Sequence, residues 1–371
     1  MGQKQKIVSV VYFGSSRISV LIGVRGANNS LVVKGRGTVE YAGYMDGEFL
    51  ELDNLKYALG TAIDIAEKNC ALKIDKLYVG VPADFSVVHT GKAEYNFMRD
   101  TRINKTHTEN ILKQINLNGF AQTHTLINRS PIYYNVNGGR KIINPVGSVG
   151  INLSVLCSFI FAEKQFIKTV KDVLFALGIA KLHFASVPLA LSLFLLPENV
   201  RDNGALFLHS GLLTTSVFVV SGDGLINLKS IGSGKGYIVS DLMEILEVNY
   251  NMAKNILEEA ALSIETKPSD NYVIFNGEEP VKFEASYVND IIKARLEMIA
   301  ENIQSTILGL DKEYLSLPIY IAGGEIDAVN GGRDYLAKCL GVNIYLAKNI
   351  FTKAGDVAAN SLLDLALLTE K

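Results

Sequence analysis

The stretch Val10-Val11-Tyr12-Phe13-Gly14-Ser15-Ser16-Arg17-Ile18 decides how the first part of the chain folds. It joins the β-branched run Ile7–Val11 to a second run, Ile18–Val24, across a short Gly-Ser-Ser turn, and this pattern predicts a β-hairpin. A third run, Leu31–Val39, follows after the polar segment 27–30. The three runs together predict an antiparallel meander.

The same pattern returns about 200 residues later. Strands are expected at Ala205–Leu208, Thr214–Ser221 and Leu225–Ser230, with turns at Ser210-Gly211 and at 222–224. A strand-turn-strand-turn-strand unit that occurs twice indicates a duplicated α/β fold with a cleft between its halves. The glycine-containing first turns of the two halves would then face each other across the cleft.

The residue pattern of the segment from Ala83 to about Phe161 differs from that of the preceding chain and predicts an inserted β-rich subdomain. Two hairpin-like runs flank a helix that is expected to begin at Thr106, because Thr106-His107-Thr108-Glu109 fits the capping-box pattern. The other elements expected are helices 53–70 (capped by Asp53), 164–177 (stopped by Gly178), 189–196 (buried), 356–368 and helices from Tyr237, Met252 and Tyr287, and strands 77–81, 151–162 and 319–322.

Composition bounds the class of protein. A chain of 371 residues with 48% hydrophobic residues is long enough for two or more cores and is predicted to be soluble and globular. Because 36 Lys and Arg balance 38 Asp and Glu, the chain has no field that would attract nucleic acid or an anionic membrane. The three cysteines lack metal spacing and, with no signal-peptide core at the N-terminus, indicate reduced thiols in the cytoplasm.

The two-fold pattern, with a late strand that ends in Gly323-Gly324, resembles the actin/hexokinase/Hsp70 superfamily, and within it FtsA, an actin-like family of bacterial cell division. The resemblance rests on the collinear order of short segments. They are 10–18 (first phosphate turn), 143–147 with 150–153 (end of the extra subdomain 1C), 187–190 (start of the second domain), 214–215 (second phosphate turn), 231–241 (connecting segment), 291–295 (a helix of subdomain IIB) and 322–324 (adenosine turn).

This resemblance implies an α/β, actin-like, RNase H-like duplicated two-domain fold with an inserted β-rich 1C subdomain. Subdomain IA would comprise residues 1–82 and 163–187, 1C residues 83–162, IIA residues 188–241 and 310–371, and IIB residues 242–309. The 1C insertion is what separates FtsA from actin and its other relatives.

The resemblance also implies a nucleotide site in the cleft. The residues that would form it are Gly14, Ser15, Ser16, Gly211, Thr214, Thr215, Gly234, Gly323, Gly324 and Glu325. Members of the superfamily hold Mg²⁺ and orient water with carboxylates. At the acidic positions of the family this chain carries Tyr12, Val187, His209 and Ser216, and Leu212-Leu213 replace glycines of the second turn.

The sequence therefore predicts a degenerate nucleotide pocket, with no catalytic residue and no metal ligands. No cofactor is expected, and ATP with Mg²⁺ would bind weakly. The alternative for Gly14, Gly211 and Gly323 is that they are ordinary turn glycines. His209 beside Ser216 lacks an orienting acid nearby and is expected to be structural, and 232–236 lacks the order of a phosphate loop.

By resemblance, the chain would be a pseudo-ATPase scaffold of bacterial cell division at the inner face of the membrane. It would bind the C-terminal peptide of an FtsZ-like tubulin homologue through IIB, as well as other division proteins. It would contact other copies of itself through 1C and domain edges, forming protofilaments, and would not bind nucleic acid. Arg99, Arg102 and Lys105 are either a solvated face of 1C or part of that contact surface. The alternatives are an ATPase of the same superfamily and a PilM-like scaffold of pilus or secretion machinery.

FtsA-like proteins usually carry a C-terminal linker and a basic amphipathic helix that binds the membrane. This sequence stops at Thr369-Glu370-Lys371 without such a helix. Membrane recruitment is therefore expected to be indirect or to use a segment absent from the chain.

Overall fold

The structure is a computed structural model that describes residues 6–27, 30–45, 47–267, 269–276, 279–348 and 356–370. Its first sheet has the strand order β10-β6-β1-β2-β3. The strands are β1 (Val8–Phe13), β2 (Arg17–Arg25), β3 (Leu31–Glu40), β6 (Lys76–Val81) and β10 (Lys181–Ser186). The first three form the predicted antiparallel meander, and β6 and β10 add to it in parallel.

The second sheet repeats this layout, with the order β13-β12-β11-β16-β17. Its strands are β11 (Ala205–Ser210), β12 (Thr215–Ser221), β13 (Gly224–Ile231), β16 (Ile319–Ala322) and β17 (Ile344–Leu346). Again three antiparallel strands are followed by two parallel ones. The duplicated α/β fold predicted from the sequence is confirmed.

Helix α1 (Leu52–Cys70) packs on the first sheet because its buried side chains recur at intervals of three and four residues. It approaches β3 so closely that a Cβ at Gly37 would overlap the Ala62 carbonyl oxygen. The predicted cap is wrong, since the helix starts one residue earlier and Glu51 precedes it without a side-chain hydrogen bond. Asp53 lies in the first turn instead, where its charge favours the helix dipole. Helix α3 (Lys164–Ala176) packs in the same core.

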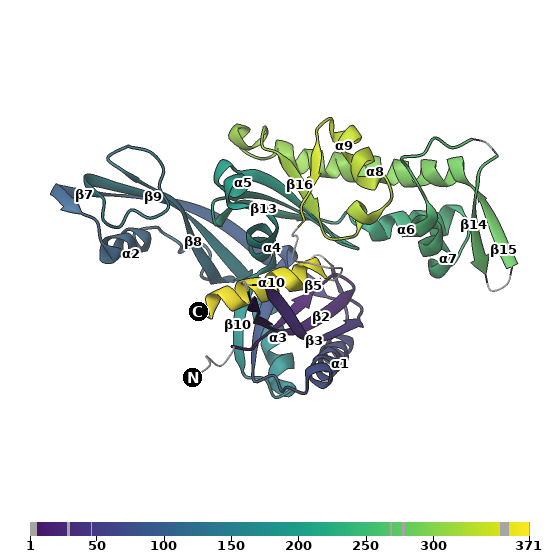
Figure 1. The fold of residues 1–371 in the computed structure, drawn as a ribbon, viewed down its shortest axis with the longest axis horizontal. Coiled ribbons are helices and arrows are strands. Elements are labelled where there is room, and N and C mark those ends of the chain that lie inside the picture. The colour runs from purple at the N-terminus through teal and green to yellow at the C-terminus, as the bar shows by residue number, and fades with distance from the viewer. Residues whose placement is uncertain are drawn as a thin grey trace.

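The 1C region, residues 83–162, contains one three-stranded sheet rather than two hairpins around a helix. Its order is β7-β9-β8, with β7 (Ser86–Arg102), β8 (His124–Val136) and β9 (Val149–Glu163), and α2 (Lys105–Lys113) packs against it. The predicted cap at Thr106 is wrong, because Asn104 caps α2 in a reciprocal capping box with His107. In Figure 1 this region extends from the body at one end of the long axis.

The IIB region, residues 242–309, lies at the opposite end of the molecule (Figure 1). It contains α7 (Tyr250–Glu259), β14 (Asn271–Asn276), β15 (Glu279–Glu284) and α8 (Ala285–Leu308). Arg295 of α8 forms a bidentate pair with Asp241 of α6 (Lys235–Ile245), with both N–O distances 2.5 Å. The remaining elements are β4 (Tyr44–Met45), β5 (Glu48–Phe49), α5 (Glu198–Asn203), α9 (Gly332–Leu340) and the short 3-10 helices Ala83–Phe85, Lys312–Tyr314 and Ile326–Ala328.

The last helix, α10 (Val357–Thr369), lies in the range 310–371 that the expected division assigns to IIA. It packs on β1 and β2 of the first sheet and on the apolar α4 (Val187–Leu195), which is buried as predicted. The physical reason is a pair of glycines in the first sheet. Gly23 and Gly80 leave room for Leu363 and Leu362 of the helix, whose side chains would contact a Cβ at either position at 2.6–2.7 Å.

The 1C sheet also covers β13, an edge strand of the second sheet. Ser158 of β9 is fully buried and bonds both backbone groups of Leu225, donating to its carbonyl at 2.6 Å and accepting from its N–H at 3.1 Å. This contact satisfies edge groups that would otherwise be free to pair with another chain.

None of the helices in the described ranges combines the length and the apolar character that a membrane crossing needs.

Candidate functional site

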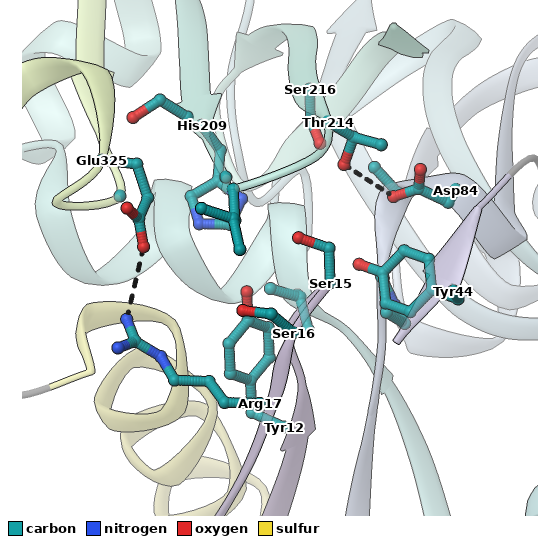
Figure 2. A pocket seen from close by; sticks show the side chains of 18 of the residues that line it. Tyr12, Ser15, Ser16, Arg17, Tyr44, Asp84, His209, Thr214, Ser216 and Glu325 are labelled. Carbon is teal, nitrogen blue, oxygen red and sulfur yellow. Dashed lines mark hydrogen bonds and ion pairs between the residues drawn. The ribbon is translucent and has the colours of Figure 1, made fainter. Parts of the chain in front are cut away.

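The two first turns face each other across the cleft, as predicted (Figure 2). The Gly14 N–H donates to the Arg17 carbonyl at 2.9 Å, and the Gly211 N–H donates to the Thr214 carbonyl at 2.8 Å. The two turns are joined directly, because the Leu213 N–H donates to the Ser15 hydroxyl at 3.2 Å. The duplicated hairpins thus bring residues 198 positions apart into contact.

Seven of the ten predicted site residues line one cavity between the turns. They are Gly14, Ser15, Ser16, Gly211, Thr214, Gly323 and Glu325. The other three lie outside its wall: buried Thr215 donates to the Ser233 carbonyl, Gly234 precedes α6, and the Gly324 N–H donates to Asp327 at 2.9 Å. The cavity measures about 40 Å³, against roughly 300–1,000 Å³ for typical small-molecule sites.

The backbone carbonyls of the second turn are hydrogen-bonded within the protein. Its Gly211 and Leu212 carbonyls accept from the Lys235 and Gly236 N–H groups at 3.2 and 2.7 Å. These are donors at the start of α6, the kind of group that binds phosphate at a helix N-terminus. The turn is so close that a Cβ at Gly234 would overlap the Leu212 carbonyl.

Two side chains in the cavity wall, at positions where the resemblance implies acids, are uncharged. The Tyr12 ring is buried beneath Gly14, and burial raises the pKa of its phenol far above the usual range, with Asp356 adding to the shift. Burial also lowers the pKa of His209 below its ordinary value, so its imidazole is neutral at pH 7. Neither group is a hard oxygen ligand of the kind that Mg²⁺ prefers.

The structure places two carboxylates in the cavity wall that sequence reasoning missed, Asp84 and Asp356. Asp356 caps α10 and accepts from the Ser19 hydroxyl at 2.8 Å. Asp84 lies three residues after the end of β6, in the 3-10 helix Ala83–Phe85, and because β6 runs parallel to β1, its position at that edge of the sheet was readable from the sequence.

Both carboxylates are engaged by protein donors. Asp84 accepts from the hydroxyls of Ser230 at 2.9 Å and Thr214 at 3.5 Å, and from Tyr44. Burial raises its pKa, although these hydrogen bonds oppose the shift. Among the described residues, no group of three or more His, Cys, Asp or Glu side chains could hold a metal ion. The two carboxylates in the cavity wall are therefore engaged within the protein rather than left free as ligands for Mg²⁺.

Glu325 closes the other side of the cavity. Its carboxylate pairs with Lys235 at 2.6 Å and with Arg17 at 3.6 Å. Figure 2 shows Glu325 and Arg17 reaching toward each other on one side of the pocket and Thr214 and Asp84 on the other. A larger cavity of about 280 Å³ lies beyond Glu325, with Tyr250, Lys254 and Leu257 in its wall.

Comparison with known proteins supports the resemblance. The chain is 24% identical to the cell division protein FtsA of Streptococcus pneumoniae over 318 residues, which are 84% of this chain and 69% of that protein. It is 20% identical to FtsA of Enterococcus hirae over 341 residues, 90% of this chain and 76% of that protein. The chain is FtsA-like. No family model matches it.

Solved structures confirm the actin-like fold of this FtsA-like chain. The PilM-PilN type IV pilus biogenesis complex has a chain that matches with a TM-score of 0.62 at 13% identity, covering 100% of this chain and 99% of that one. MreB5 of Spiroplasma citri bound to ADP gives 0.57 at 10% identity, with 98% and 96% covered. A MamK double helical filament gives 0.53 at 14% identity, with 98% and 99% covered.

Proposed function

We propose that this FtsA-like chain is a scaffold of bacterial cell division whose cleft does not hydrolyse ATP. The similarity to FtsA proteins over most of the chain supports the cell-division role. The observation that supports the pseudo-ATPase role is the hydrogen bond from Leu213 to Ser15, which joins the two turns where phosphates would lie in an actin-like ATPase.

Hydrolysis would need three things that the cleft supplies poorly. Free backbone donors are needed for the phosphates, but Leu213, Lys235 and Gly236 already donate within the protein. Carboxylates are needed for Mg²⁺, but Asp84 and Asp356 accept from protein donors. Space is needed for the triphosphate, but the cavity between the turns measures only about 40 Å³.

We further propose that the IIB region binds the C-terminal peptide of an FtsZ-like protein, that the 1C region contacts other copies, and that the chain acts at the division site. The charge distribution supports two different contact surfaces. Residues 242–309 contain 12 Asp and Glu against 5 Lys and Arg, whereas residues 83–162 contain 8 Lys and Arg against 4 Asp and Glu. Self-association is supported by the fold shared with MamK, which forms a double helical filament.

One calorimetric series tests this function, with Mg-ATP and an FtsZ C-terminal peptide as separate titrants and phosphate release measured in parallel. We expect peptide binding, no turnover and no ATP binding in the micromolar range. Micromolar ATP binding with turnover would instead support the ATPase alternative, in which Asp84 and Asp356 serve as the acids. A scrambled FtsZ peptide, which keeps the composition and charge of the original, is the control that separates specific binding from attraction to the acidic region 242–309.

A PilM-like assembly scaffold is the second candidate. The PilM-PilN match covers the whole chain, and its TM-score of 0.62 is higher than those of the MreB5 and MamK matches, 0.57 and 0.53. This candidate shares the pseudo-ATPase cleft and differs in partner. Absence of FtsZ-peptide binding, together with absence of ATP turnover, favours it over the division role.

A further inference from the structure

The mouth of the cleft is bridged by a three-membered ionic cluster. Glu325, from the loop after β16, contacts Lys235 at the start of α6 and Arg17 at the start of β2. The pair that crosses between the halves is Glu325–Arg17, in which the Glu325 side chain is 14% exposed and that of Arg17 47%. Lys235, 25% exposed, holds Glu325 from within the second half. Because Arg17 belongs to the first sheet and Glu325 to the loop after β16 of the second, the cluster ties the two halves together.

A second tie lies on the opposite side of the same cavity. Asp84 follows β6 of the first sheet and accepts from Ser230 of β13 and from Thr214 in the turn before β12. Hydrogen bonds to a carboxylate are stronger than neutral ones. Asp84 therefore holds both the second phosphate turn and the edge strand of the second sheet.

A further contact between the halves lies close to Asp84, where Ser158 of β9 meets Leu225 of β13; we call this part of the 1C region the 1C root. Strand β7 follows β6 of the first sheet after the 3-10 helix Ala83–Phe85, and β9 leads into α3. Ser158 of β9 bonds both backbone groups of Leu225 in β13 of the second sheet. The contact leaves no spare room, since a Cβ at Gly224 would meet the Ser158 Cβ at 2.8 Å and Ile132 at 3.0 Å. The 1C root thus braces the two halves at the level of Asp84.

We propose that Glu325 and Asp84 are positioning residues that hold the two halves closed in place of a bound nucleotide. The closed state of this chain then does not depend on ATP. This inference rests on the proposed pseudo-ATPase function, because it assigns to side chains the cross-linking that a nucleotide between the two turns would provide.

Distance measurements between spin labels on the full chain test the proposal. One label replaces Tyr57 on α1, which is 71% exposed, and the other replaces Glu259, which is exposed at the end of α7. The native cysteines Cys70, Cys157 and Cys339 are first replaced by serine or alanine, with the thermal unfolding curve as the check on folding.

The unsubstituted chain should give one narrow distance distribution that millimolar Mg-ATP leaves unchanged. The double variant D84A/E325Q should shift the distribution to longer distances and broaden it. Asp84→Asn keeps an oxygen that accepts from Ser230 and Thr214, so D84N should stay close to the starting distribution where D84A does not. Glu297→Gln, an acid whose carboxylate accepts from Tyr335, is the matched control and should change nothing.

A D84A/E325Q distribution identical to the starting one would overturn the proposal, as would a starting distribution that narrows only when Mg-ATP is added. If the double variant does not fold, the single variants D84A and E325Q give the same test through smaller shifts. ATP turnover in solution would refute the pseudo-ATPase function on its own, whereas the label distances decide the closure.

Discussion

The backbone N–H of Leu213 donates to the Ser15 hydroxyl at 3.2 Å, so the two hairpin turns of a duplicated fold are bonded to each other. In a nucleotide-binding relative, both turns would direct their donors at phosphate groups between them. Here a serine side chain of one turn has taken the donor of the other. The two turns are thereby joined across the cleft by a direct hydrogen bond.

Replacing Ser15 with alanine should remove the acceptor of the Leu213 N–H and change few other contacts. Since Leu213 is only partly buried, water can replace the lost acceptor, and we expect a loss of about 0.5–1.5 kcal/mol in the free energy of unfolding. Hydrogen exchange at the Leu213 amide should become faster. Ser16→Ala is the control, because no side-chain hydrogen bond of Ser16 is seen in the described part of the chain; equal effects of both substitutions would contradict the prediction.

Gly234 should not tolerate a side chain, although its backbone conformation is open to other residues. A Cβ there would overlap the Leu212 carbonyl and push the second turn away from α6. We expect Gly234→Ala to cost about 1–3 kcal/mol in chemical denaturation. Gly232 lies in the same loop, and the nearest atom to a Cβ there is the Tyr237 hydroxyl oxygen at 3.8 Å, so Gly232→Ala should leave the free energy of unfolding nearly unchanged. A loss of stability as large as that of Gly234→Ala would show that the loop is sensitive to any substitution.

Ser158→Ala should loosen the 1C root. The substitution leaves the N–H and the carbonyl of Leu225 without their buried partner, and we expect a loss of about 1–3 kcal/mol. Hydrogen exchange should increase at the start of β13. Ser154→Ala, on the same face of β9 but partly exposed, is the matched control and should leave β13 protected.

His209 should make stability depend on pH in a defined direction. Burial lowers its folded-state pKa below the ordinary 6.5, so the unfolded chain binds the proton more readily between those two values. The contribution is fully present above about pH 6.5 and is lost as pH falls toward the folded-state pKa. His209→Asn should reduce the difference in unfolding free energy between pH 7.5 and pH 5.5; an unchanged difference would exclude His209 as its source.

Much of the fold followed from local patterns. Strand β16 was predicted with its observed bounds, and the meander β1–β3 and its repeat β11–β13 followed from alternating β-branched runs and turn glycines. The helix caps were less predictable. Asn104 rather than Thr106 caps α2, because the cap is set by which residue takes the extended conformation before the helix, and several polar neighbours could have done so.

The sequence by itself determined the duplication and the two facing turns, because these depend on residue identity and on short-range order. Only the tertiary structure decided where α10 packs, that Asp356 lines the cleft, and that Glu325 bridges it. These features join residues far apart in the chain, and local pattern does not report such contacts. The strand ends meet only when the sheets have formed, so the chemistry of the cleft is a property of the packed fold.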